Sequence, residues 1–291
     1  MAKELVGIIG GSGLGEALAG HITGTKAEHI ETPFGRTSSE VLIGTLGDRE
    51  VAFIHRHGDG HTINPSLVPY AANIFALKTL GVKTLISSAA VGSLQEEKSP
   101  TDLVIVDQFI DKTFRRNNSF FDELGAVHCE FSHPCCERLR QTIIECGRDI
   151  DTEVHQSGTY VCMEGPDFST RAESLMHKQW GGDLIGMTAM PEAKLARQAQ
   201  MCYALVALVS DYDCWREHDI STGKLELLQE IIGNLTAATN NAIELIKKVL
   251  EHKDSLCDDS CSCRKSLELA VWTKPDSIDE DRRKELEVLF E

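Results

Sequence analysis

Short apolar runs alternate with longer amphipathic segments along most of the chain. Apolar runs bounded by glycine or polar turns are typical of buried strands, and apolar residues at steps of three and four are typical of helices. This pattern predicts strands over 5–10, 41–46, 51–55, 83–90, 103–106, 159–163 and 203–209. It predicts helices over 66–80, 135–147, 191–200 and 228–249. Strands that alternate with helices, without an internal repeat, predict an α/β fold.

From about residue 253 the sequence becomes polar and charged, so we divide the chain into a domain over 1–252 and a C-terminal extension over 253–291. The extension has too few apolar residues to bury thiols, although three cysteines lie in it: Cys257, Cys261 and Cys263. Their spacing fits no common zinc pattern, because no second pair of Cys or His follows at a suitable distance. A redox role or a disulfide fits this trio better than a metal.

The composition argues against several classes of function. The chain has 291 residues, of which 45 are acidic and 29 are basic, so its formal net charge is −16. A surface this acidic repels phosphate backbones, so we expect no nucleic-acid partner. No apolar stretch approaches the ~20 residues that span a bilayer, and the first residues lack the features of a signal peptide. We therefore expect a cytoplasmic protein without a membrane partner.

Polar loops follow several predicted strands at their carboxyl ends, where open α/β sheets bind ligands. The first is a glycine-rich turn around Ser12, whose successive backbone N–H groups form an anion nest. It lacks the features of a dinucleotide site or a P-loop, so a simple tight turn is the alternative. Another predicted loop, over 87–94, consists of small residues that let a ligand approach the backbone, with simple packing under a helix as the alternative.

Arg56 and His57 follow the predicted strand over 51–55. An Arg fork and a His donor at the end of a strand suit a phosphate oxyanion, and a solvated loop is the alternative. His57 and His61 also raise the question of a metal site. No carboxylate or thiolate partner clusters with them in the sequence, so we expect no metal here.

A second group of side chains suits a planar base. Phe168 is placed to stack on such a base, and Thr188 to donate to an anion, with a core Phe and a helix cap as the alternatives. Asp211 and Asp213 are two residues apart at an extended strand end, so they project to the same side. They suit a donor-rich base edge, or proton delivery if one carboxyl raises the pKa of the other. A surface acidic turn is the alternative.

Eight short sequence motifs follow one another along the chain. They are Gly11-Ser12-Gly13, Thr32-Pro33-Phe34-Gly35, Arg56-His57-Gly58, Asn73-Ile74, Gly92-Ser93-Leu94, Glu164-Gly165-Pro166-x-Phe168-Ser169, Met187-Thr188-x-Met190-Pro191-Glu192 and Ser210-Asp211-Tyr212-Asp213-Cys214-Trp215. Together they resemble the 5′-methylthioadenosine phosphorylase family, within the trimeric purine nucleoside phosphorylase superfamily. The resemblance covers about 5–250. It implies a single-domain α/β phosphorylase/hydrolase-like fold, with a mixed twisted β-sheet flanked by helices.

The resemblance also implies a role for each matching residue. Phosphate is held by Ser12, Arg56, His57, Thr188 and the backbone around Ala89 and Ala90. The nucleoside is held by Phe168 against the base, Asp211 and Asp213 on its N6/N7 edge, Met187 along the ribose, and His61, Leu227 and Leu228 near the 5′-alkylthio group. Ser169 and Lys224 influence specificity, and His128 reaches into the site of a neighbouring subunit. The chain departs from common family residues at Ala89 (often Thr), Gly186 (often Asn), Lys224 (often apolar) and Asp59 (often basic).

The activity that the resemblance implies is phosphorolysis of 5′-methylthioadenosine to adenine and 5-methylthioribose 1-phosphate, in purine and methionine salvage. Phosphate attacks C1′ and stabilises the cationic sugar, while Asp213 or Asp211 acts as general acid toward N7. The only co-substrate is inorganic phosphate, with no metal or organic cofactor, and the assembly is a homo-oligomer, either a trimer or a hexamer (a dimer of trimers). One rival is a 6-oxopurine nucleoside or methylthioinosine phosphorylase, which favours Asn over the Asp pair. Another is a non-catalytic nucleoside-binding protein, which does not need Arg56 and His57 together with a base-edge carboxylate.

The resemblance extends to the cysteine-containing end of the chain. Some archaeal relatives carry a similar Cys-Ser-Cys near the C-terminus together with disulfides. By this resemblance we expect either a disulfide from the extension to the body, with Cys202 as one candidate, or a thiol-exchange element at Cys261 and Cys263. Three free, exposed thiols in a frayed tail are the alternative.

Overall fold

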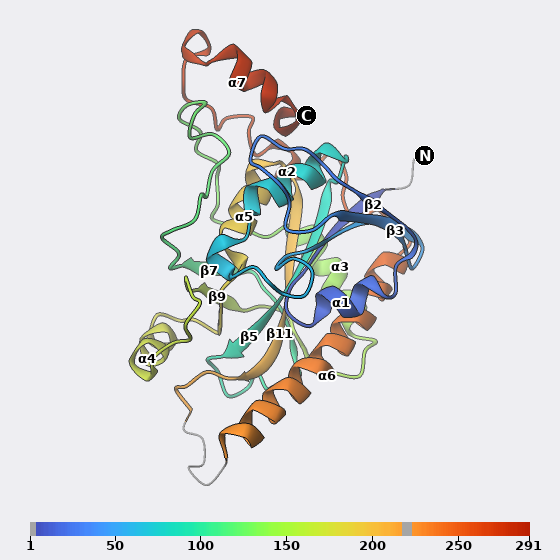
Figure 1. Ribbon diagram of the computed structural model, residues 1–291, viewed down its shortest axis with the longest axis vertical. Helices are drawn as coiled ribbons and strands as arrows, with labels where there is room; N and C mark the ends of the chain where they lie inside the picture. Colours follow the sequence, from blue (N-terminus) through green and yellow to red (C-terminus); the bar gives the residue numbers. More distant parts are fainter. Residues whose placement is uncertain (1–3, 217–222) are drawn as a thin grey trace.

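Figure 1 shows a computed structural model of the chain, which describes residues 4–216 and 223–291. Its centre is a set of parallel strands in the order β4 (Arg49–His55), β1 (Leu5–Gly10), β5 (Thr84–Ser93) and β11 (Cys202–Tyr212). Buried apolar residues fill these four strands, as parallel sheets covered on both faces require. Their carboxyl ends lie at one edge, where the polar loops of the sequence analysis begin.

Antiparallel and short parallel strands complete one mixed sheet, which has eleven strands within the described residues. Its other members are β2 (Thr23–Glu28), β3 (Val41–Leu46), β6 (Leu103–Ile105), β7 (Gln108–Asp111), β8 (Val154–His155), β9 (Thr159–Cys162) and β10 (Leu184–Gly186). The main path runs β2-β3-β4-β1-β5-β10-β9-β7, with β11, β6 and β8 branching from β5. The expected mixed sheet flanked by helices is confirmed.

Helices cover both faces of the sheet. On one face α2 (Tyr70–Thr79) and α5 (Ala189–Gln198) pack around Ile9 of β1. On the other face α3 (Glu137–Gly147) and the long α6 (Lys224–Glu251) pack around the neighbouring Ile8. The remaining helices and 3₁₀ turns of the described residues are α1 (Leu14–Ala19), α4 (Arg171–Gln179), α7 (Glu280–Glu285), η1 (Pro65–Leu67), η2 (Ser262–Lys265), η3 (Pro275–Ser277) and η4 (Glu287–Phe290). None of the helices in the described residues is both long and apolar enough to span a membrane.

The sequence pattern missed the strands that carry little apolar signal. The edge strand β2 reads Thr-Gly-Thr-Lys-Ala-Glu and has hardly any buried side chains, so nothing marks its inward face. The strands β8 and β10 have two and three residues, too few for a period to emerge. The predicted helices were found with ends displaced by a few residues, because helix termini fray and depend on tertiary contacts.

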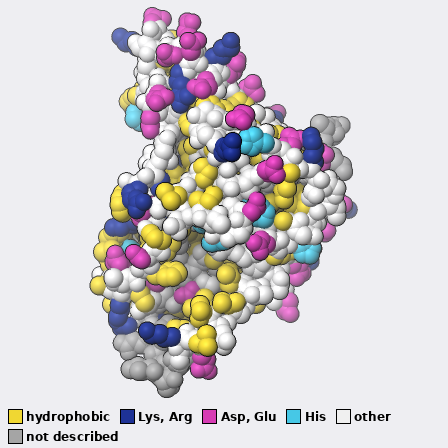
Figure 2. Space-filling view, in the orientation of Figure 1, with side chains coloured by type: hydrophobic (Ala, Val, Ile, Leu, Met, Phe, Trp, Pro, Cys, Tyr) yellow, Lys and Arg dark blue, Asp and Glu magenta, His cyan; other side chains and the backbone are white. Residues whose placement is uncertain are grey.

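The C-terminal extension packs closely against the body. Its first part buries Leu256 and Cys263 among residues of α3 and α6, and its last part buries Leu286 and Leu289 on the α2 and α5 side. The expectation that the extension is too polar to bury thiols is therefore wrong. Its apolar residues are few, but those at 256, 257, 263, 267, 270, 286 and 289 are buried against the body. Figures 1 and 2 place α7 at the top of the view, with side chains of both charges crowded on it.

Candidate active site

A cavity of about 530 Å³ opens at the carboxyl ends of the central strands. It brings together residues predicted from separate loops, namely Ser12, Arg56, His57, His61, Ala89, Ala90, Phe168, Ser169, Met187, Thr188, Asp211 and Asp213. Its lining mixes a few polar groups with apolar side chains such as Ile185 and Met163. Such a composition is typical of a small-molecule site.

The Arg56 side chain is fully buried and makes its paired hydrogen bonds to Glu192. Its Nε donates to Glu192 Oε2 at 2.8 Å and its Nη2 to Glu192 Oε1 at 3.1 Å. Nη2 also donates to Ser87 Oγ, and Nη1 donates to the Ser88 carbonyl at 2.7 Å. Because a guanidinium has five N–H groups, one Nη1 hydrogen is left for a ligand. The expected Arg fork on phosphate is therefore wrong, since the fork holds Glu192.

His57 is buried next to Arg56, and its ring is stacked on that of His61 with centroids 4.3 Å apart. Burial, and secondly the Arg56 charge, lowers the pKa of His57 to about 4, so the ring is neutral near pH 7. Nδ1 lies 2.8 Å from the Ile63 carbonyl, which can only accept, so Nδ1 carries the proton. Nε2 is then an acceptor. The sequence analysis assigned His57 as a donor, and this geometry corrects that assignment.

The glycine turn after β1 lies directly against the Arg56 guanidinium. A Cβ on Gly11 would lie 2.6 Å from Arg56 Nη1 and 2.7 Å from the Ser88 carbonyl, so only glycine fits. The Gly11 N–H donates to Ser88 Oγ at 3.3 Å. This close packing holds Ser12 at the cavity wall that Arg56, His57 and Thr188 also line.

The two carboxylates lie at the end of β11, just after an irregularity in its pairing with β5. Val209 pairs with Val91 and Asp211 with Gly92, so Ser210 is an extra residue of the bulge type. Ser210 Oγ donates to Asp211 Oδ1 at 2.6 Å. Asp213 is buried, and its Oδ2 has no hydrogen-bond partner within the described parts of the chain. Phe168, at the same cavity, is 86% exposed, so the alternative of a core Phe is wrong.

Arg116 organises the loops around Met187, and the sequence analysis did not identify it. Its Nε donates to Glu164 Oε1 at 3.1 Å and its Nη2 to the Glu164 carbonyl at 2.6 Å. Nη1 donates to the Met187 carbonyl at 2.6 Å. The polar stretch around Arg116 has no pattern that marks one of its arginines as buried. Glu192 belongs to the motif over 187–192, but no feature of the sequence indicated that it pairs with Arg56.

A local contact explains why residue 186 is glycine in this chain, where the resemblance leads one to expect Asn. A Cβ at this position would overlap the hydroxyl of Tyr160, which is fully buried. The same hydroxyl lies 3.3 Å from the Thr188 backbone nitrogen and accepts its hydrogen bond. Tyr160 therefore occupies the volume that a larger residue 186 would need.

The structure does not bring every predicted residue to the cavity. From α6 the lining residues are Ile231 and Leu235, whereas Leu228 is 52% exposed and Lys224 lies at the exposed start of the helix. Leu227, one residue earlier, is half-buried and also absent from the lining. Leu227 and Leu228, expected near a 5′ substituent, thus lie outside the cavity lining, which Ile231 and Leu235 reach from one to two turns further along α6.

His128 lies away from this cavity, beside the extension. Its ring contacts that of Trp272 with centroids 5.3 Å apart, and its N–H donates to the Ala270 carbonyl at 2.9 Å. A role in a neighbouring subunit involves a second copy of the chain, so this assignment stays a prediction.

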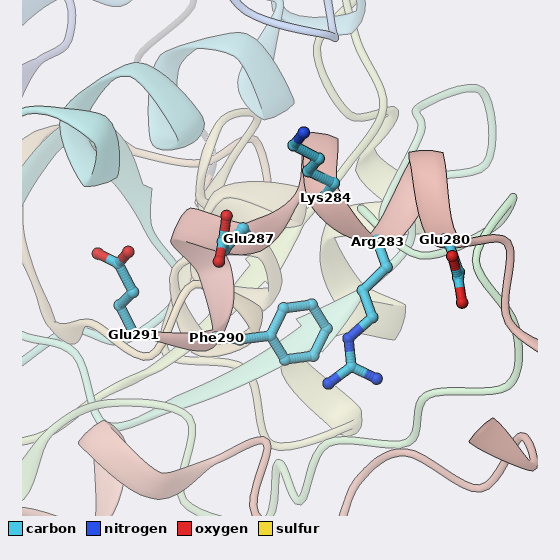
Figure 3. A pocket seen from close by; sticks show the side chains of 6 residues that line it. All are labelled: Glu280, Arg283, Lys284, Glu287, Phe290 and Glu291. Carbon is cyan, nitrogen blue, oxygen red and sulfur yellow. The ribbon is translucent and has the colours of Figure 1, made fainter.

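A second hollow, of about 510 Å³, lies between α7 and η4. Figure 3 shows the Phe290 ring turned toward the Arg283 guanidinium, which lies 5.6 Å from the ring centroid. The other side chains around it are charged and largely exposed, with none of the predicted catalytic residues. We therefore assign the candidate active site to the cavity at the strand ends.

The chain is similar to known proteins over nearly its whole length. The model of the phosphorylase superfamily matches residues 5–251. An S-methyl-5′-thioadenosine phosphorylase of Cereibacter sphaeroides is 46% identical over 279 residues, 94% of this chain and 92% of that protein. One of Gloeobacter violaceus is 42% identical over 98% of this chain and 94% of that protein.

Solved structures are similar over the same length. A methylthioadenosine phosphorylase from an antarctic soil metagenomic library has a TM-score of 0.87 and 40% identity, covering 99% of both chains. The Schistosoma mansoni methylthioadenosine phosphorylase in complex with tubercidin has a TM-score of 0.77 and 36% identity, covering 85% of this chain and 91% of that one.

Proposed function

The chain belongs to the S-methyl-5′-thioadenosine phosphorylase family of the phosphorylase superfamily, and we propose that its strand-end cavity converts 5′-methylthioadenosine and phosphate to adenine and 5-methylthioribose 1-phosphate. The enzyme is a pentosyltransferase. One observation carries the proposal: Asp213 Oδ2 is buried without a partner among the described residues, in the cavity that His57 and Thr188 also line. A buried carboxyl group and an anion-binding wall thus share one cavity.

Phosphate is held by neutral groups and one nearby charge. The hydroxyls of Ser12 and Thr188 and the backbone around Ala89 and Ala90 line the same wall. Arg56 contributes its remaining Nη1 hydrogen, and its charge is largely offset by Glu192. His57 Nε2, as an acceptor, selects a phosphate oxygen that still carries a proton. It orients the dianion HPO₄²⁻ so that an unprotonated oxygen faces C1′.

The purine base lies against a second set of cavity residues, which assist its departure. Breaking the C1′–N9 bond places negative charge on the base and positive charge on the sugar, which phosphate stabilises. Asp213, when protonated, donates from Oδ2 to N7 of the leaving base, a general-acid step. Asp211, held by Ser210, accepts from the exocyclic amine at N6. Phe168 covers the base face, and Met187 and Ile231 line the sugar and its 5′ substituent.

A homo-oligomer, trimer or hexamer, completes the site in this proposal. The support is that Phe168 is 86% exposed at the cavity mouth of a single chain. A neighbouring copy that covers Phe168 would exclude water from the base, and His128 is the residue that the sequence assigns to this contact. We further propose that phosphate is the only co-substrate, without an added cofactor, and that the enzyme works in the cytoplasm.

Release of free base is the direct test of the function. We expect adenine from 5′-methylthioadenosine only when phosphate is present, and little hypoxanthine from inosine. Base release without phosphate would indicate a hydrolase. Preference for inosine would favour the 6-oxopurine activity, and binding of nucleoside without turnover would favour a binding protein.

The low pKa of His57 predicts a pH dependence of stability. His57 titrates near 4 in the folded chain and near 6.5 when unfolded, so the unfolded state binds more protons between these values. The free energy of unfolding therefore falls as the pH drops through this window. We expect the stability advantage of wild type over His57→Gln to shrink from about pH 7 to about pH 4.5, measured by urea unfolding. A difference that does not change with pH would contradict a neutral, buried His57.

A further inference from the structure

A cluster of four cysteine sulfurs lies outside the active site. The Sγ atoms of Cys136, Cys202, Cys261 and Cys263 all lie within 4.8 Å of one another. Cys261 Sγ is 3.7 Å from Cys136 Sγ and 3.5 Å from Cys202 Sγ. Three of the four side chains are buried, and Cys261 is half-buried. Four thiols that come from distant parts of the sequence and lie this close together can bind one common ligand.

Backbone hydrogen bonds position these cysteines. Cys136 precedes α3, and its N–H donates to the Tyr203 carbonyl at 2.8 Å. Cys202 begins β11, and its N–H donates to the Lys83 carbonyl at 2.9 Å. Cys261 and Cys263 lie at the start of η2, where the Cys261 carbonyl accepts a hydrogen bond from the Arg264 N–H at 2.9 Å. The cluster therefore joins a helix start, a strand start and the extension.

We propose that these four sulfurs bind one Zn²⁺ as a closed tetrathiolate site. A zinc–sulfur bond is about 2.3 Å, so neighbouring sulfurs of a regular tetrahedron are about 3.8 Å apart. The measured separations of 3.5 and 3.7 Å lie close to that edge length. Binding replaces four S–H protons by one metal ion, and the protons pass to solvent. No electron transfer is involved.

The surroundings suit the charge of such a site. Four thiolates and Zn²⁺ carry a net charge of −2, which burial would disfavour without nearby cations. Arg264 follows Cys263 directly in η2, and its backbone N–H donates to the Cys261 carbonyl at 2.9 Å. Its side-chain Nε is buried and has no hydrogen-bond partner among the residues that the structure describes. Arg264 therefore places a cation beside two of the four cysteines.

A disulfide is the competing use of these thiols. Cys202 Sγ lies 3.0 Å from Sγ of Cys257, a fifth cysteine beside the four. A disulfide bond is about 2.05 Å long, and the structure holds all ten cysteines as free thiols. The expected link from the extension to Cys202 stays a prediction. Four sulfurs that all lie within 4.8 Å of one another suit a single tetrahedral metal ion, which binds all four at once.

The cluster is a structural site and takes no part in catalysis. At about 3.3 Å per residue, β11 places Cys202 about 30 Å from Asp211 at the cavity. All four positions around the metal are filled by protein, as in structural zinc sites. Zinc would fasten the extension to α3 and β11, and its binding free energy would add to the folding free energy.

Metal analysis of the full-length protein tests the proposal. The protein is purified without chelator, and its zinc content is measured by mass spectrometry beside thiol counts under non-reducing conditions. We expect one zinc per chain in wild type, and at least a tenfold loss in the double variant Cys261→Ser with Cys263→Ser. The matched control is Cys257→Ser, which removes the fifth cysteine and should keep the zinc. Chelation should lower the Tm of wild type and leave that of the double variant unchanged.

Several outcomes would overturn the proposal. Wild type without zinc and with ten titratable thiols would show a cluster of free thiols only. Wild type without zinc and with fewer than ten thiols would show disulfides. Zinc retained in the double variant, or lost in Cys257→Ser, would refute this ligand set. Because Cys136 and Cys202 are buried and their variants risk misfolding, the single variant Cys261→Ser with Co²⁺ in place of zinc gives a second measurement: an unchanged thiolate-to-cobalt absorption band would also refute it.

Discussion

Replacing Asp213 by Ala is expected to lower kcat/KM for 5′-methylthioadenosine by about 100- to 10,000-fold, the range typical of a lost general acid. Asp213 Oδ2 has no hydrogen-bond partner among the described residues, so its removal leaves no other protein group unpaired there. The loss should therefore appear in base release and hardly in stability. Steady-state kinetics at saturating phosphate, together with urea unfolding of the same variant, measure both.

The Asn variants of the two carboxylates are the matched controls. Asp213→Asn cannot donate a carboxyl proton, and its amide also suits the O6 edge of a 6-oxopurine. We expect the ratio of kcat/KM for adenine nucleosides over inosine to fall in Asp213→Asn, because specificity is a difference in transition-state binding. An unchanged ratio in both Asp213→Asn and Asp211→Asn would mean that the carboxylates do not face the base.

Replacing Arg56 by Ala is expected to cost about 3–5 kcal/mol of stability, because it leaves Glu192 charged and buried without its cation. Arg56 is fully buried and Glu192 is 1% exposed. Loss of the nearby charge and of one Nη1 hydrogen bond should also raise KM for phosphate at least about tenfold. Urea unfolding and phosphate saturation curves measure the two effects.

A double variant separates these effects. Arg56→Met with Glu192→Gln removes both charges, so much of the stability should return while phosphate binding stays weak. Ser87 and Tyr203 both donate to Glu192, at 2.5 and 3.0 Å, and the Gln amide oxygen can still accept from them. Phosphate saturation like that of wild type in either variant would remove Arg56 from the anion site.

The central strands and the loops that follow them were predictable because their signals are local. The run at 5–10 and the glycines after it lie side by side in the sequence, and so do the strand at 51–55 and Arg56. The family assignment, made from eight ordered segments, is confirmed by relatives that are 46% and 42% identical over 94% and 98% of this chain. The exposed edge strand β2 had no such signal, because pairing with β3 alone defines it.

Partnerships between distant residues were not predictable from patterns along the chain. Arg56 was expected to bind the ligand with its fork, but Glu192, 136 residues away, takes that fork. The same limit applies to the cysteines. No second pair of Cys or His follows Cys263 in the sequence, whereas the structure places Cys136 and Cys202, which precede it, in the cluster. Only the topology, which places the starts of α3 and β11 beside the extension, brings the four together.

The extra residue at Ser210 marks where β11 can change its length. Deletion of Ser210 would leave Val209 opposite Val91 and Asp211 opposite Gly92, so Asp211 would keep its present side of the sheet and lose only the hydroxyl that donates to it. Side chains alternate along a regular strand with a period of two, so a residue inserted after Asp211 would instead turn Asp213 to the opposite side. Homologous enzymes can therefore gain or lose a residue at the bulge and retain both carboxylates, whereas the spacing between the two carboxylates is fixed.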